Sequence, residues 1–184
     1  MALPRYTVPS LTLEQGAKVA EILQERLHSL NDLQLTLKHI HWNVVGPHFI
    51  AVHEMLDPQV DAVRGMADAV AERIATLGVA PVGTPGALVA ARTWDDYTLG
   101  RASAIEHLGA LDEVYQGVIA SHRQAAADTE QLDAVTNDLL IGHLHDLELF
   151  HWFVRAHLES SGGALATEGA TTELDAAREA RQAM

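Results

Sequence analysis

The sequence predicts an all-α fold in which four long amphipathic helices form one bundle, with a long connection between the second and third helices. Two observations carry this prediction. Apolar residues recur at three- and four-residue spacing over four long segments, and no segment shows the alternation of a half-buried strand. The 184 residues, of which 48% are hydrophobic and 20% charged, suffice for one domain with a hydrophobic core and exclude a disordered chain.

The first helix is predicted from about residue 13 to the low forties. Thr12 and Gln15 have the spacing of a capping box, which satisfies backbone N–H groups at the start of a helix. The apolar residues that follow have helical spacing, namely Val19, Leu23, Leu27, Leu30 and Leu37. Gly46 and Pro47 interrupt the pattern and are expected to end the helix.

The second helix is predicted from about Phe49 to Leu77, where the following Gly78 suits a helix C-terminus. Pro58 lies inside this segment. Because a proline removes one backbone hydrogen bond and clashes with the preceding turn, we expect either a kink or a new helix start with Asp57 as its N-cap.

The second half of the chain repeats the helical pattern after a crossover. Residues 78–92 are rich in glycine and proline and are predicted to form a loop, followed by a short helical turn over residues 93–96. The third helix carries an apolar stripe over residues 105–119, and the fourth runs from about Thr129 to Ser160. One long crossover that joins two helical hairpins is the arrangement of ferritin-like bundles.

The bundle is expected to span residues 12–163, after an N-terminal extension of residues 1–11. Residues 164–184 show no apolar stripe, so we expect a mobile C-terminal tail. The N-terminus lacks the basic and apolar regions of a signal peptide, and no run approaches the roughly 20 apolar residues of a transmembrane helix. The sequence therefore predicts a cytoplasmic protein with no membrane segment.

The composition restricts the chemistry that the chain can perform. There is no cysteine, which excludes disulfides, thiolate metal sites and cysteine nucleophiles and fits a reducing compartment. The net charge of −13 should repel nucleic acids and anionic lipids and attract cations. Eleven histidines in so acidic a chain are unusual, and imidazole and carboxylate are both common metal ligands. Any metal site must therefore use nitrogen and oxygen ligands.

Two pairs of potential metal ligands lie on the second helix. His53 and Asp57 are four residues apart, and so are Asp68 and Glu72. Both pairs project within about a third of the helix circumference, to one side of the apolar stripe. The alternative is a solvated acidic face with Asp57 as a helix cap.

The distance between the two pairs excludes a common ion on one helix. The 11 residues from Asp57 to Asp68 correspond to roughly 16 Å along the axis, whereas metal–oxygen bonds are about 2 Å long. Two copies of the helix, packed antiparallel about a two-fold axis near residues 62–63, would place His53 and Asp57 opposite the partner's Asp68 and Glu72. The pattern therefore predicts a metal site that exists only in a dimer.

His41 is the candidate ligand on the first helix. It follows Leu23 by 18 residues, or about five full turns, and therefore points in the direction of the core stripe. The alternative is a histidine at the edge of the core that hydrogen-bonds to a carbonyl group. The neighbouring Trp42 is expected either to pack at an interface or to quench radicals beside such a site.

Residues 38–57 resemble the signature of the Dps family of miniferritins, with the sequence KHIHWNVVGPHFIAVHEMLD. Residues 68–78 continue the resemblance in register, with the sequence DAVAERIATLG, and the whole chain to about Gly163 follows the layout of that family. The resemblance implies a ferroxidase site with two ligand groups, which are His41, His53 and Asp57 of one subunit and Asp68 and Glu72 of its two-fold partner. It also implies a hollow dodecamer that oxidises Fe²⁺, preferably with hydrogen peroxide, and stores ferric iron.

The sequence leaves two other functions open. A di-iron site inside each bundle needs two inward-facing Glu-x-x-His pairs, and only the pair Glu148–His151 has its histidine in line with the core. The other alternative is a DNA-compacting protein with secondary iron chemistry. Because the N-terminal segment through Ser10 has only Arg5 as a basic residue, and residues 164–184 have a net charge near −2, DNA binding is expected to be weak.

Two further polar groups lie on the predicted fourth helix. Asp133 and Asp138 are candidates either for a negatively charged pore at a three-fold axis or for acids that offset the helix dipole. The cluster of His143, His145 and Asp146 is predicted to be solvated surface, since residues two apart on a helix point in different directions.

Overall fold

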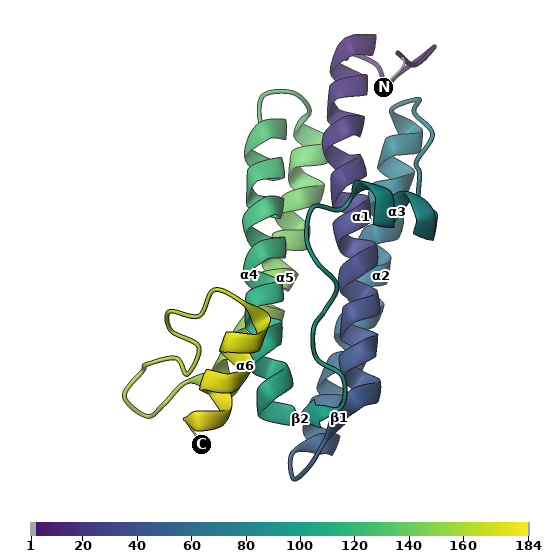
Figure 1. Cartoon of the computed structure of the whole chain (residues 1–184). Helices are drawn as coiled ribbons and strands as arrows, with labels where there is room; N and C mark the ends of the chain where they lie inside the picture. Colours follow the sequence, from purple (N-terminus) through teal and green to yellow (C-terminus); the bar gives the residue numbers. More distant parts are fainter. Residues whose placement is uncertain (1–2, 184) are drawn as a thin grey trace.

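The computed structural model describes residues 3–183 and confirms an all-α bundle with a short helix in the connection (Figure 1). Its helices are α1 (Leu13–Asn43), α2 (Phe49–Thr76), α3 (Pro85–Ala91), α4 (Ala104–Thr129), α5 (Ala134–Leu158) and α6 (Glu173–Gln182). Two short strands, β1 (Val44–Val45) and β2 (Ala102–Ser103), pair in parallel. Among residues 3–183, no helix has the length and apolar character needed to cross a bilayer.

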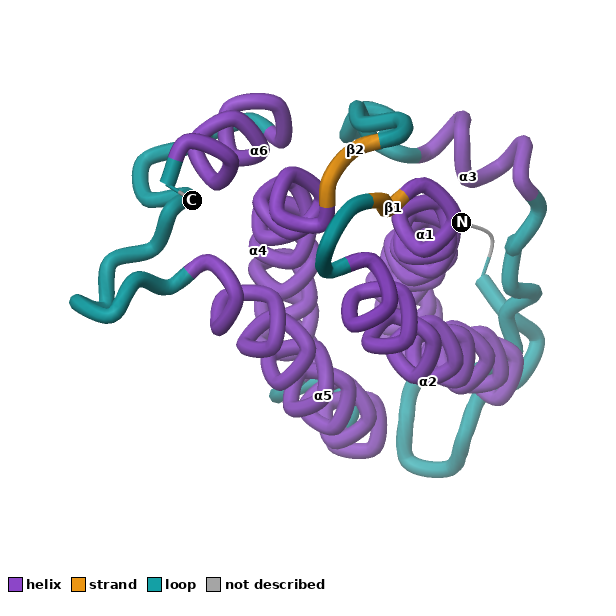
Figure 2. The backbone as a smooth tube through the Cα atoms, turned by 90° about the horizontal axis from the view of Figure 1, so that it is seen from below, coloured by secondary structure: helices purple, strands orange, loops and turns teal. Residues whose placement is uncertain are grey.

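Two helical hairpins build the bundle, as predicted: α1 packs along α2, and α4 packs along α5 (Figures 1 and 2). The capping box at the start of α1 is confirmed, because the Thr12 hydroxyl accepts a hydrogen bond from the backbone of Gln15 and the Gln15 side chain accepts one from the backbone of Thr12. Large aliphatic side chains fill the core, among them Leu23, Leu30, Leu37, Leu56, Leu111, Leu140 and Leu147. Inside this core the hydroxyl group of Tyr115 donates a hydrogen bond to Gln59 at 2.7 Å.

Helix α2 continues through Pro58, so the prediction of a new helix start at this point is wrong. Asp57 lies in the helix interior, and the N-cap position is taken by His48. Leu56 and Val63, on either side of the proline, are fully buried in the core. Burial of this apolar face outweighs the loss of one backbone hydrogen bond, and it leaves the side chain of Asp57 free of a capping role.

The connection between the hairpins also differs from the prediction. Helix α3 lies inside the segment that was expected to be a loop, whereas residues 93–96, expected to form a helical turn, are irregular. Thr84 is the N-cap of α3 and Pro85 stands in its first turn. A proline at this position lacks only an N–H group that would have no partner in the helix, and its fixed φ favours helical backbone. Proline disfavours a helix at interior positions, but in the first turn Pro85 favours the start of α3.

Helix α5 begins at Ala134, five residues later than predicted, with Asp133 as its N-cap. The Asp133 carboxylate accepts hydrogen bonds from Thr136 and, at 2.5 Å, from Arg73 of α2. Burial would raise the pKa of Asp133, but these hydrogen bonds outweigh burial and lower it. Asp133 is thus a helix cap that also ties α5 to α2, whereas Asp138 is exposed.

The residues after Gly163 form an arm that includes helix α6, an element that the sequence analysis did not predict in this segment. Helix α6 packs against α4 (Figures 1 and 2), and its buried residues are Ala176, Ala177 and Ala180. The arm also reaches the connection, since Glu173 accepts two hydrogen bonds from Thr98 at 2.8 Å. A face made of alanines carries no large apolar residue, and for this reason it showed no apolar stripe in the sequence.

We expect Gly109→Ala to release the C-terminal arm, defined as residues 164–182. A Cβ atom at Gly109 would lie 2.5 Å from the backbone oxygen of Ala176, and overpacking of this kind costs about 1–3 kcal/mol. Gly117→Ala on the same helix is the matched control, because a Cβ atom there meets nothing within 4 Å. It should stabilise the protein by about 0.5–1 kcal/mol. Urea unfolding and hydrogen exchange of α6 measure both effects, and equal protection of α6 in the two variants would contradict the expected close packing.

Candidate metal centre

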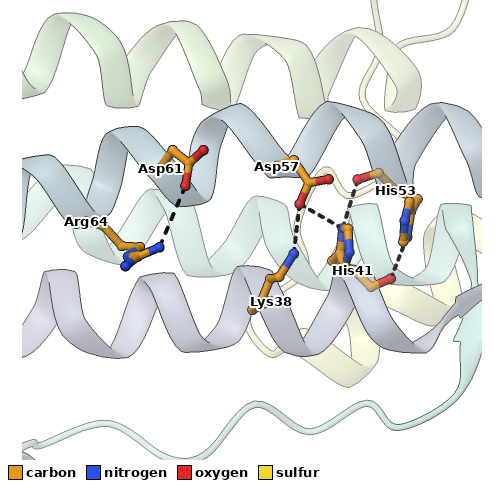
Figure 3. Close-up of polar contacts among 6 residues, drawn as sticks. All are labelled: Lys38, His41, His53, Asp57, Asp61 and Arg64. Carbon is orange, nitrogen blue, oxygen red and sulfur yellow. Dashed lines mark hydrogen bonds and ion pairs between the residues drawn. The ribbon is translucent and has the colours of Figure 1, made fainter.

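Three of the five predicted ligands meet at one end of the α1–α2 hairpin (Figure 3). His41 comes from the last turn of α1, and His53 and Asp57 come from the first turns of α2. One potential ligand atom from each of the three lies within 4.8 Å of the other two. Within residues 3–183, this is the one group of three or more such side chains with metal-binding spacing.

The two histidines orient each other through reciprocal hydrogen bonds. His41 Nδ1 donates to the backbone oxygen of His53 at 3.0 Å, and His53 Nδ1 donates to the backbone oxygen of His41 at 2.9 Å (Figure 3). The rings stack with their centroids 3.6 Å apart. Because a carbonyl group can only accept, both Nδ1 atoms carry the proton, and both Nε2 atoms keep the lone pair that binds a metal. A hydrogen bond from His41 to a carbonyl group was the alternative to a ligand role in the sequence analysis. That hydrogen bond is present, and it orients the ring so that Nε2 can bind a metal.

Asp57 supplies the carboxylate of the group. Its Oδ1 atom accepts a hydrogen bond from Lys38 at 2.8 Å and lies 3.3 Å from His41 Nδ1 (Figure 3). The hydrogen bond from Lys38, together with the positive charge of its ammonium group, lowers the pKa of Asp57. The ionised form, which binds metals, is thereby favoured. Two imidazoles and one carboxylate are a donor set that suits Fe²⁺ with open coordination positions.

Asp68 and Glu72 do not join this group within one chain. Both side chains are exposed on α2, beyond Pro58 in the direction of its C-terminus. Asp68 lines a surface groove of about 370 Å³ between α1, α2 and the start of the connection. The chain therefore brings together three predicted ligands and leaves two acids of the same helix open to a neighbour.

The alternative site inside the bundle is not assembled in the described residues. His151 bonds to Asp112 at 2.5 Å instead of joining Glu148, whose carboxylate pairs with Arg123. Burial would raise the pKa of Asp112, but hydrogen bonds from His151, Thr167 and Arg155 outweigh it and lower the pKa to about 2. The half-site found in the sequence is thus part of a buried structural network around Asp112.

His143 corrects another prediction, because it is buried, not solvated. It faces His122 of α4, which the sequence did not single out, while His145 is exposed. The spacing of His143 from Leu140 and Leu147 places it on the core stripe of α5, and this periodicity could have identified it. The polar residues His145 and Asp146 follow closely in the sequence, and grouping His143 with them obscured its place on the core stripe.

Comparison with known proteins agrees with the fold and the motif. The family profile described as a ferritin-like domain matches residues 20–161. The DNA protection during starvation protein of Mycolicibacterium smegmatis is 58% identical over 177 residues, which cover 96% of this chain and 97% of that protein. The chain belongs to the Dps family. Among solved structures, Mycobacterium smegmatis Dps has a TM-score of 0.90 at 57% identity, covering 94% of this chain and 97% of that one. DpsA14 from Streptomyces coelicolor has a TM-score of 0.88 at 65% identity, covering 90% and 99%.

This Dps-family chain exposes large apolar side chains on the two helices that carry the ligands. Trp42, directly after His41, is 69% exposed, Ile50 is 56% exposed and Leu35 is 62% exposed. The helices that carry the ligand group therefore expose several large apolar side chains, Trp42 among them, beside that group.

Proposed function

We propose that this Dps-family protein is a ferroxidase that oxidises Fe²⁺ with hydrogen peroxide at sites shared between two subunits, and that it stores the ferric product. One observation carries the proposal. His41, His53 and Asp57 are gathered and oriented in each chain, while Asp68 and Glu72 stand exposed on the same helix. An antiparallel two-fold contact along α2 would add the two acids of one chain to the three ligands of the other.

The donor set fits the proposed chemistry. Imidazole stabilises the ferrous ion and carboxylates suit the ferric product. A site with both kinds of ligand can therefore hold iron before and after its oxidation from Fe²⁺ to Fe³⁺. Two ferrous ions each give one electron to hydrogen peroxide, its O–O bond breaks, and two protons complete two molecules of water. Because both electrons arrive at one site, no hydroxyl radical is released. Iron is the substrate and the cargo of this reaction.

We further propose a hollow dodecamer built from two-fold dimers and located in the cytoplasm. Twelve chains with a charge of −13 each carry a total charge of about −156, which attracts cations to the shell. The apolar side chains exposed on α1 and α2 support the two-fold contact. A closed shell would also give the ferric product an enclosed space.

Size and chemistry test this proposal together. We expect a particle of about 240 kDa, from twelve chains of 19.9 kDa. Addition of Fe²⁺ and peroxide should consume two ferrous ions per peroxide, measured by iron absorbance and residual peroxide. His41→Ala and Asp68→Ala should each slow oxidation by at least about 10-fold while the particle persists. A monomer that oxidises iron at the rate of the parent protein would contradict the shared site.

DNA compaction is a second candidate function, favoured by the names of the relatives. The Mycolicibacterium smegmatis relative is called a DNA protection during starvation protein. In this chain the C-terminal arm carries Arg178 and Arg181 against four acids, and α6 is packed on α4 instead of extending into solvent. We therefore propose that iron chemistry is the main activity and DNA binding is weak.

Weak DNA binding gives a direct prediction. Because the arm releases few counterions from DNA, a mobility-shift assay at about 150 mM salt should show no stable complex at micromolar protein. A variant with Glu173, Asp175 and Glu179 all changed to Lys should bind more tightly and with a steeper salt dependence. Tight binding by the parent protein would reverse the order of the two functions.

A further inference from the structure

Two histidines face each other inside the bundle, separate from the candidate iron site. His122 lies on α4 and His143 on α5, the two helices that pack side by side in Figure 2. Their ring centroids are 5.7 Å apart and the ring planes are inclined by 45°. His122 is completely buried and His143 is 8% exposed. Both side chains belong to the interior of the hairpin.

Three of the four ring nitrogens of this pair have no partner. Within residues 3–183, no hydrogen bond reaches Nδ1 or Nε2 of His122 or Nδ1 of His143, and all three atoms are buried. A buried polar atom without a partner loses its hydration with no compensation, and folded proteins satisfy nearly all such atoms. The pair therefore has the character of a binding site for a species that interacts with imidazole nitrogen.

Both rings are in the form that binds metals. Burial lowers the pKa of His122 to about 3, with further lowering by His143 and Arg26. Burial also lowers the pKa of His143 to about 4, against the opposing effect of Asp146. Both imidazoles are therefore neutral at physiological pH, and each offers a nitrogen lone pair.

The spacing of the rings fits one shared ion. An imidazole nitrogen lies about 2 Å from the metal that it binds, so two rings that approach one ion from opposite sides have centroids about 6 Å apart. The observed 5.7 Å is close to this value. The separation of the ring centroids is therefore compatible with one ion held between the two rings.

The surroundings favour a metal of low charge and low coordination number. Within the described chain, this pair does not belong to any group of three or more potential metal ligands with metal-binding spacing. Arg26, which donates a hydrogen bond to Ser121 beside His122, adds a positive charge nearby. Divalent ions such as Zn²⁺ and Fe²⁺ usually take four or more ligands, often with carboxylates, and would be repelled more strongly by Arg26. We propose that His122 and His143 form a two-coordinate site inside the bundle for a soft monovalent metal ion, namely Cu⁺.

Competition with a chromogenic Cu⁺ chelator under anaerobic conditions tests this proposal. The parent for the experiment carries His41→Ala and His53→Ala, so that the other histidine pair does not contribute. This protein should bind one Cu⁺ per chain, and adding His122→Leu and His143→Leu should abolish the binding. X-ray absorption of the loaded protein should show two nitrogen ligands. The matched control is His145→Ala, which removes an exposed histidine of α5 and should leave the stoichiometry unchanged.

Thermal unfolding distinguishes a loss of the Cu⁺ site from a failure of the variants to fold. The two leucines remove three buried nitrogens that have no partner, so the melting temperature in the presence of a chelator should be unchanged or higher. Added Cu⁺ should raise the melting temperature only where the histidine pair is intact. His122→Gln provides a second, conservative variant that should weaken Cu⁺ binding at least 10-fold. Absence of bound Cu⁺ in the intact pair, or one retained Cu⁺ per chain in the leucine variant, would overturn the proposal.

Discussion

Two inactive variants of this protein should recover about a quarter of the iron-oxidation sites when their chains are assembled together. The first variant carries His41→Ala and His53→Ala, and the second carries Asp68→Asn and Glu72→Gln. Each variant alone should lose at least about 100-fold in peroxide-dependent oxidation of Fe²⁺, because every site lacks one group of its ligands. A mixed dimer, in contrast, combines the three intact ligands of the second chain with the two intact acids of the first.

The arithmetic follows from the two-fold axis. Each mixed dimer has one complete site and one site that lacks four of the five ligands and keeps only Asp57. Random assembly of equal amounts makes half of the dimers mixed, so one site in four is restored. The rate is measured by stopped-flow absorbance after the two chains are unfolded together and refolded, with tags to confirm that both are present in one particle.

A second mixture provides the control. His41→Ala and His53→Ala, placed on separate chains, affect the same ligand group, so no mixed dimer contains a complete site. This mixture should stay inactive. Recovery in the control, or no recovery in the complementary mixture despite proven co-assembly, would show that the ligands are not shared across the two-fold axis.

Helix geometry made much of the site predictable from the sequence. The angle of 100° per residue is a local property, so the common side of His53, Asp57, Asp68 and Glu72 follows from their numbers alone. The same reasoning gave the direction of His41, and the structure places its ring against α2. The reciprocal bonds between the two histidines and the backbone were beyond this reasoning. They depend on the register of α1 against α2, which is set by tertiary packing.

Two of the errors have a common physical origin, because each concerns a contact whose partner is far away in the sequence. The alanine face of α6 is apolar only in the context of α4, where Gly109 leaves room for close approach. His143 has no polar partner in its own helix and is buried by the hairpin with α4. Periodicity detects large apolar stripes, and it is insensitive to interfaces built from small or polar side chains.

Asp112 is the polar centre of one such interface, and its replacement by Asn should destabilise the protein at neutral pH. Its side chain is only 2% exposed, and its two oxygens accept hydrogen bonds from His151 and Arg155 of α5 and from Thr167 of the C-terminal arm. An asparagine of the same shape lacks the negative charge and directs N–H groups toward donors. The pKa of Asp112, about 2 against the usual 3.8, corresponds to about 2 kcal/mol of unfolding free energy at pH 7. Urea unfolding at fixed protein concentration measures this loss.

The sign of the pH dependence separates this charge effect from a loss of packing. Because the folded-state pKa of Asp112 lies below its unfolded value, its contribution is complete above about pH 4–5 and declines as the pH falls toward 2. The stability difference between the parent and Asp112→Asn should therefore shrink between pH 5 and pH 3. Glu113→Gln is the matched control, since burial and the neighbouring Asp112 raise the pKa of Glu113, so its neutralisation should cost no stability at pH 7. A difference for Asp112→Asn that is the same at pH 3 and pH 7 would show that shape, and not the buried charge, holds the C-terminal arm on the bundle.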